Sequence, residues 1–150
     1  QLQIIGEGKL AADLRSLTSD PAINFAGRQS SDQVLADMQH ARVLCAPSIR
    51  ASNGDSEGLP TVIPEAQASG LPVVTSDRAG ATEGMIDGVS GIAFPERDHD
   101  ALVNALVRYL TDDAFAASSS AAARRFAEDR LDMAAHTLKL EEYYDDLSAP

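Results

Sequence analysis

The chain has 150 residues and a formal net charge of −11 at pH 7, with 44% hydrophobic and 23% charged residues. This length and composition are those of one globular domain with a proper hydrophobic core. The negative charge argues against binding of DNA or RNA, which needs clustered Lys and Arg, and against a basic membrane-surface patch. The single cysteine, Cys45, lies in an apolar run, so we interpret it as a core residue and expect a reducing, cytoplasmic compartment. No apolar run approaches a membrane span and no signal peptide is visible, so membrane association is not encoded in this stretch.

Short apolar runs alternate with amphipathic segments along the chain, which is the pattern of a parallel sheet covered by helices on both faces. Strands are predicted at residues 2–5, 22–25, 42–46, 72–75 and 91–94. Helices are predicted after Gly8 (carrying Leu10, Leu14 and Leu17) and at residues 32–40, 60–69, 81–86, 98–110, 113–128 and 131–147. Pro64 is expected in the first turn of its helix and Gly70 at that helix's C-terminus. With no internal repeat and no visible boundary, we expect a single α/β domain over residues 1–150.

The polar segment from Ser56 to Glu65 links a predicted strand end to a predicted helix. Ligands of open α/β sheets bind at the carboxyl ends of the strands. A helix N-terminus offers unpaired N–H groups and a partial positive charge, which suit a phosphate without any basic side chain. Glu57 and Glu65 would repel phosphate, but carboxylates suit sugar hydroxyls because they accept charge-assisted hydrogen bonds. Together these features describe a nucleotide-sugar site.

The two glutamates also have a plainer interpretation. Glu57 would then be a solvated loop residue, and Glu65 an early-helix glutamate that the helix dipole favours. Their spacing alone leaves both interpretations open.

The run SEGLPTVIPEAQASGLPVV, residues 56–74, resembles the signature of the glycosyltransferase group 1 family. These are retaining enzymes of the GT-B architecture, built from two Rossmann-like domains. The family motif has two glutamates separated by seven residues, as Glu57 and Glu65 are. Other matches follow in order along the chain: Gly6-Glu7-Gly8, Pro47-Ser48, Gly80, Glu83, Asp87-Gly88 and Gly91. The resemblance implies a Rossmann-like parallel sheet that forms the carboxyl-terminal, donor-binding domain of such an enzyme.

The resemblance implies a role for each matching residue. Glu57 would take the catalytic position and contact hydroxyls of the transferred sugar, and Glu65 would hold the ribose. The turn before the helix would meet the diphosphate through the backbone of Gly58, Leu59 and Thr61. Pro60 has no N–H, so it would shape this turn without donating.

A second turn, after Phe25, would lie near the base in the same family. It consists of Gly27, Arg28 and Gln29. Arg28 also suits an ordinary surface position.

The family's donor domain starts with an additional strand and helix, whose basic residues bind the diphosphate, and follows an acceptor-binding amino-terminal domain. Residues 1–150 open on a strand-like run without an initiating Met, and we expect both parts to be missing from them. We therefore expect a fragment that alone binds donor weakly and transfers nothing. Its last helix resembles the segment that returns to the amino-terminal domain, with Tyr143, Tyr144 and Leu147 marking where that domain would pack.

We expect no metal and no cofactor, because His40, His99 and His136 show no ligand spacing and the nucleotide-sugar would be the substrate. The first hypothesis is the donor-binding domain of a retaining glycosyltransferase that transfers a hexose. The alternative is a stand-alone nucleotide or nucleotide-sugar binding module without catalysis. A receiver-like domain fits poorly, since Gly6-Glu7-Gly8 and Lys9 lack the acidic cluster that it requires.

Overall fold

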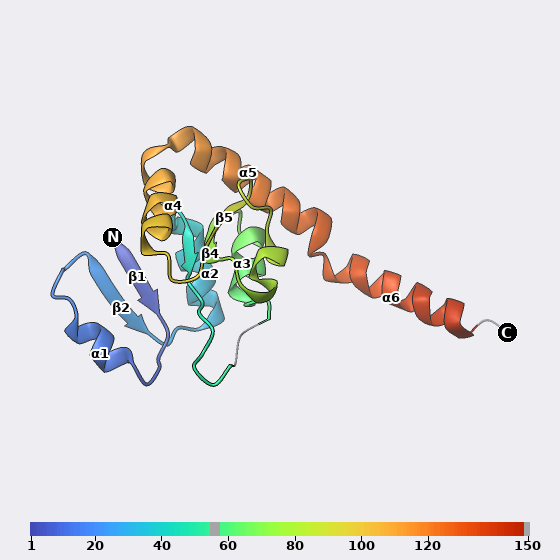
Figure 1. Ribbon diagram of the computed structural model, residues 1–150. Helices are drawn as coiled ribbons and strands as arrows, with labels where there is room; N and C mark the ends of the chain where they lie inside the picture. The colour runs from blue at the N-terminus through green and yellow to red at the C-terminus, as the bar shows by residue number, and fades with distance from the viewer. Residues whose placement is uncertain (55–57, 149–150) are drawn as a thin grey trace. The chain divides into compact units, whose positions relative to one another are not determined.

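Within the described residues, every pair of neighbouring strands is parallel, and strands alternate with helices (Figure 1). The computed structural model describes residues 1–54 and 58–148. In chain order the elements are β1 (Leu2–Ile5), α1 (Ala11–Ser16), β2 (Ile23–Gly27), α2 (Ser31–His40), β3 (Leu44–Ala46), α3 (Val62–Ala68), β4 (Val73–Ser76), the 3-10 helix η1 (Ala79–Gly84), β5 (Gly91–Phe94), α4 (His99–Thr111), α5 (Asp113–Arg130) and α6 (Met133–Ser148). Two compact units, Gln1–Asp37 and Met38–Pro150, divide within α2 and are described separately.

The first unit contains the parallel pair β1–β2, joined through α1. The strands pair from Leu2 with Ile23 to Ile5 with Gly27. Gly27 has a φ of +69° and Gly6 a φ of +126°, and the Gly6 N–H donates to the Gly27 carbonyl at 2.8 Å. Because side chains rarely adopt positive φ, glycine suits the turns that end both strands here.

The second unit is built on a three-stranded sheet of order β3-β4-β5. Val73 and Val74 on the central strand β4 are both fully buried. Successive residues of a strand point to opposite faces, so both faces of β4 are covered. α3 packs against β3 and β4, and α4 packs against β4 and β5. The prediction of a parallel α/β fold with helices on both faces is confirmed.

Tyr109 of α4 belongs to a cluster of buried hydrophobic residues in the second unit. Its side chain is fully buried among Val74, Phe94 and Ala116. Its hydroxyl donates to the Ser119 Oγ at 3.3 Å. Burial raises the pKa of Tyr109 above its ordinary value, so the hydroxyl stays protonated and remains a donor at neutral pH. This contact joins α4 to α5 inside the core.

On the other side of the second unit, α3 ends in a Schellman motif. The Leu71 N–H donates to the Ala66 carbonyl at 2.8 Å, and the Gly70 N–H to the Gln67 carbonyl at 3.0 Å. Gly70 has a φ of +69°, which confirms its predicted place at the end of this helix.

α5 also contacts this end of α3. The Arg124 Nη1 donates to the Ala68 carbonyl at 2.6 Å, and the Ser120 Oγ to the Gly70 carbonyl at 2.7 Å. These bonds satisfy carbonyl groups that a helix end leaves without an intrahelical partner. They hold α3 in place, and α3 carries one of the candidate site residues.

The last helix, α6, extends from the core of the second unit (Figure 1). Met133, Leu140, Tyr144 and Leu147 are 80%, 52%, 62% and 82% exposed. At 100° per residue these four lie within about 60° of one another, so they form an apolar stripe. Tyr143 is also exposed, at 68%. None of the described helices combines the length and the apolar character that crossing a membrane requires.

Each predicted helix and strand is present in the structure, and most begin and end within one or two residues of the predicted positions. β3 begins at Leu44 rather than at Arg42. The Arg42 guanidinium instead donates to the Tyr109 carbonyl at 2.7 Å and pairs with Asp113. The helix predicted at residues 81–86 is a 3-10 helix that starts at Ala79. Pro64 lies in the first turn of α3, as predicted.

Candidate functional site

The predicted diphosphate turn leads directly into α3 in the second unit. Gly58, Leu59 and Thr61 are exposed, whereas Pro60 is buried. The Pro60 carbonyl accepts the Ile63 N–H at 3.0 Å, and the Thr61 carbonyl accepts the Glu65 N–H at 3.2 Å. The Thr61 hydroxyl makes no capping hydrogen bond to the first turn. The turn therefore presents its main chain at the helix start, and Pro60 anchors it in the core.

Glu65 lies in the first turn of α3 and its side chain is exposed. A carboxylate at this place is favoured by the helix dipole and remains available to a ligand. Glu57, the predicted sugar contact, lies outside the described residues. The structure thus places four of the predicted residues, Gly58 to Thr61, in one turn, with Glu65 one helical turn further on.

Two glycines of η1 lie against this turn. A Cβ on Gly80 would lie 3.2 Å from both the Gly58 carbonyl carbon and the Leu59 nitrogen. A Cβ on Gly84 would lie 2.7 Å from Leu59 Cδ1 and 2.9 Å from Ile63 Cγ2. A Cβ at position 80 would press on the backbone of the turn, and one at position 84 on the Leu59 and Ile63 side chains, so glycine suits this close approach.

Side chains at the carboxyl ends of the strands hold the start of the same β3–α3 connection. The Thr75 Oγ1 donates to the Ala46 carbonyl at 2.9 Å, and the Ser76 Oγ to the Ser48 carbonyl at 2.5 Å. Both hydroxyls come from β4. The connection therefore leaves β3 along the carboxyl edge of the sheet, where the ligands of such sheets bind.

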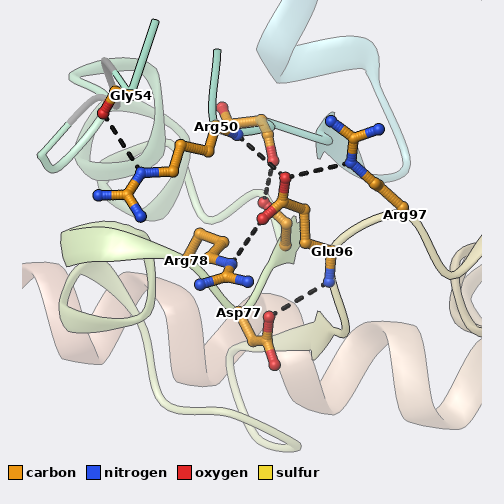
Figure 2. Close-up of polar contacts among 8 residues, drawn as sticks. Arg50, Gly54, Asp77, Arg78, Glu96 and Arg97 are labelled. Atoms are coloured by element: carbon orange, nitrogen blue, oxygen red, sulfur yellow. Dashed lines mark hydrogen bonds and ion pairs between the residues drawn. The ribbon is translucent and has the colours of Figure 1, made fainter. Parts of the chain in front are cut away.

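Glu96, two residues beyond β5, gathers several groups at this edge (Figure 2). Its Oε1 accepts the Arg50 backbone N–H at 3.0 Å and lies 3.5 Å from Arg97 Nε. Its Oε2 lies 2.6 Å from Arg78 Nε. The Asp77 carboxylate accepts the Glu96 N–H at 3.3 Å. The Glu96 side chain is only 8% exposed, in contrast to 57% for Arg78.

This environment lowers the pKa of Glu96 below its ordinary value. The largest cause is the hydrogen bond from the Arg50 N–H, and the charge of Arg78 and the hydrogen bonds from Arg78 and Arg97 add to it. Burial acts in the opposite direction. Glu96 is therefore ionised at neutral pH, as its pairing with Arg78 requires.

Sequence reasoning assigned no functional role to Glu96, Arg78 or Asp77. A signal existed, because each follows the carboxyl end of a predicted strand, 72–75 or 91–94, by two or three residues. That position places them at the edge where a site is expected. Nothing in the sequence, however, indicated that one carboxylate would pair with two separate loops.

The predicted base-contacting turn belongs to the first unit. Gly27 ends β2 with its positive φ, Arg28 is exposed, and the Gln29 Nε2 donates to the Ala26 carbonyl at 3.2 Å. These contacts fix the shape of the turn. Among the described residues no group of three or more His, Cys, Asp or Glu side chains is placed to hold a metal ion.

Fold and site together define a parallel α/β protein with a loop-to-helix turn at the carboxyl edge of its sheet. The chain belongs to the family of glycosyl transferases group 1, whose model matches residues 1–112. It is 36% identical over 109 residues to the amylovoran biosynthesis glycosyltransferase AmsK of Erwinia amylovora, covering 70% of this chain and 27% of that protein. It is 33% identical over 131 residues to a GDP-mannose-dependent monoacylated alpha-(1-6)-phosphatidylinositol monomannoside mannosyltransferase of Corynebacterium glutamicum, covering 85% and 34%.

Solved structures show the same fold. Sucrose-phosphate synthase from Thermosynechococcus elongatus matches with a TM-score of 0.81 and 24% identity, over 98% of this chain and 38% of that one. HepE of Anabaena in complex with UDP-glucose matches with a TM-score of 0.78 and 21% identity, over 96% and 40%. The chain thus spans well under half the length of the relatives that it resembles.

Proposed function

We propose that residues 1–150 are the donor-binding part of a retaining glycosyltransferase that transfers a hexose from a nucleotide-diphospho-sugar. One observation carries this proposal. In a chain of the group 1 family, an exposed turn at the carboxyl edge of a parallel sheet enters α3, and an exposed glutamate follows in the first helical turn.

Each part of this arrangement has a role in the proposal. Main-chain N–H groups around Gly58, Leu59 and Thr61 donate to the diphosphate, with the partial positive charge of the helix start behind them. Glu65 accepts hydrogen bonds from the ribose hydroxyls, and Glu57 from hydroxyls of the transferred sugar. Catalysis then consists of positioning the donor and stabilising the leaving diphosphate, with no metal or cofactor.

The names of two related proteins indicate which nucleotides to test for binding. HepE was crystallised with UDP-glucose, and the C. glutamicum relative is GDP-mannose-dependent. We propose that the donor of this protein is a UDP-sugar or a GDP-sugar.

One surface of the second unit supports a larger protein around residues 1–150. The apolar stripe of α6 is exposed along the helix. We propose that an amino-terminal domain packs on this stripe, near Tyr143 and Leu147, and supplies the acceptor site. Residues 1–150 alone therefore transfer no sugar.

The proposal is tested by titrating UDP and GDP into the full-length protein and into its Glu65→Ala variant. We expect one of the two nucleotides to bind and Glu65→Ala to weaken it about tenfold, the effect of losing one charge-assisted hydrogen bond. Glu128→Ala, which removes an exposed glutamate of α5, serves as the matched control and should bind normally. Equal binding by all three proteins would place the site elsewhere, and binding without sugar transfer by the full-length protein would favour the stand-alone module.

A further inference from the structure

The outgoing segment of the β3–α3 connection, residues 46–50, is held at every second residue. The main-chain partners are the Ala46 carbonyl, the Ser48 carbonyl and the Arg50 N–H. The side chains that bind them come from Thr75 and Ser76 on β4 and then from Glu96 beyond β5. The outgoing segment is therefore led along the carboxyl edge from β3 to the end of β5.

Glu96 is itself fixed by the turn that carries it. The Asp98 N–H donates to the Pro95 carbonyl at 2.9 Å, and Arg97 between them has a φ of +68°. A side chain in this left-handed region is strained, so surrounding contacts must stabilise the turn. The bond from the Glu96 N–H to Asp77 and the two ion pairs of its carboxylate are such contacts (Figure 2).

The returning segment of the same connection, Gly58 to Thr61, lies against the chain that follows β4. Gly80 touches the backbone of Gly58 and Leu59 closely enough that even a Cβ would be crowded. Two residues before Gly80, the Arg78 guanidinium is bound to Glu96. Residues 76–80 therefore contact both the outgoing segment and the returning segment. Glu96 binds residues 76–80 through Arg78 and the outgoing segment through Arg50.

We propose that Glu96 is a positioning residue of the donor site. It fixes the outgoing segment through the Arg50 N–H and supports the returning segment through Arg78 and the Gly80 contact. It thereby sets where the backbone of Gly58–Thr61 lies, without itself touching the donor. This inference rests on the proposed function, because it assigns Glu96 a role in that same site.

Two substitutions separate the two contacts of Glu96. Glu96→Gln keeps an oxygen that accepts the Arg50 N–H but removes the charge that pairs with Arg78. Glu96→Ala removes both. Glu128→Ala is the matched control, because it breaks another glutamate–arginine pair, to Arg124 at 2.7 Å, on the exposed face of α5.

The first measurement is amide hydrogen exchange in the full-length protein without nucleotide. Glu96→Ala should accelerate exchange of the Arg50 amide about tenfold, as expected when a hydrogen bond to a charged group is lost, and should also accelerate exchange in residues 58–62. Glu96→Gln should spare the Arg50 amide, and Glu128→Ala should change neither region. Unchanged exchange at residues 58–62 in Glu96→Ala would overturn the proposal, whether or not a nucleotide binds.

The second measurement is the dissociation constant of UDP and GDP for the same full-length variants. We expect about a tenfold weaker complex for Glu96→Ala, the effect of losing one hydrogen bond between the displaced turn and the charged diphosphate. Glu96→Gln should bind nucleotide more tightly than Glu96→Ala. If Glu96 only stabilised the fold, two variants of equal melting temperature would bind nucleotide equally well. Normal affinity in Glu96→Ala would refute the positioning role. If the unaltered protein binds neither nucleotide, the proposed function fails, and the exchange measurement still decides whether Glu96 positions the turn.

Discussion

Gly80→Ala is a small change that acts on the proposed site through backbone contact. Gly80 lies outside the positive-φ region, so alanine can adopt its backbone conformation. The added Cβ would lie 3.2 Å from the Gly58 carbonyl carbon and the Leu59 nitrogen, and 3.4 Å from the Gly58 oxygen. Optimal contacts between carbon atoms are about 3.5–4.0 Å, so the two backbones must separate by about 0.5 Å. The displaced atoms are those that the proposal places against the diphosphate.

Gly80→Ala is expected to affect the free energy of unfolding and the reaction rate by different amounts. Replacing glycine by alanine stabilises by about 0.4–1 kcal/mol through the unfolded chain, and crowding costs about 1–3 kcal/mol. The net loss of about 1 kcal/mol lowers the melting temperature of a domain of this size by about 2–4 °C. If a misplacement of 1 Å costs about a hundredfold in rate, a shift of half that size costs about tenfold.

The assay is kcat/KM for the donor in the full-length protein, together with thermal unfolding. Gly91→Ala is the control, because its Cβ would lie 2.6 Å from the Val73 oxygen and 2.3 Å from Met85 Sδ rather than against Gly58. It should destabilise by about 3 kcal/mol, the upper end for crowding, yet leave kcat/KM of the folded enzyme nearly unchanged at low temperature. Unaltered kinetics in Gly80→Ala, or an equal loss in both variants, would refute the reasoning.

Two further predictions concern the turn that carries Glu96. Arg97→Gly relieves the strain of a φ of +68° and should raise the melting temperature by about 2 °C, whereas Arg97→Ala, which keeps the strain, should not raise it. A fall in the Arg97→Gly midpoint would mean that the exposed pair to Glu96 outweighs the strain. Because the folded-state pKa of Glu96 is lowered, its charge stabilises the protein above the ordinary pKa of about 4.5 and ceases to do so as the pH falls through the lower folded value. The difference in melting temperature between the unaltered protein and Glu96→Gln should therefore shrink below about pH 4.5, and a constant difference between pH 7 and pH 3 would contradict this pairing.

Much of the fold was predictable because it depends on local pattern. Val73 and Val74 lie in a short apolar run, and such a run indicates a strand buried on both faces, as β4 is. Pro64 and Gly70 fixed the two ends of α3 to within two residues, since proline is tolerated only in a first turn and glycine suits a left-handed end.

The candidate site was predicted in part for a related reason. A helix start after a strand end is visible in the sequence, and the positions of Gly58 to Thr61 and of Glu65 follow from it. The roles of these residues in donor binding stay predictions, as do those of Gly27, Arg28 and Gln29.

The sequence by itself determined the parallel α/β architecture, the family and the loop-to-helix turn, because periodicity, glycine and proline act over a few neighbouring residues. Only the tertiary structure decided what supports that turn. Glu96 is 46 residues from Arg50, and Gly80 is separated from Gly58 by a helix and a strand. Parallel strands bring such distant positions to one edge, and no local pattern encodes which side chains meet there.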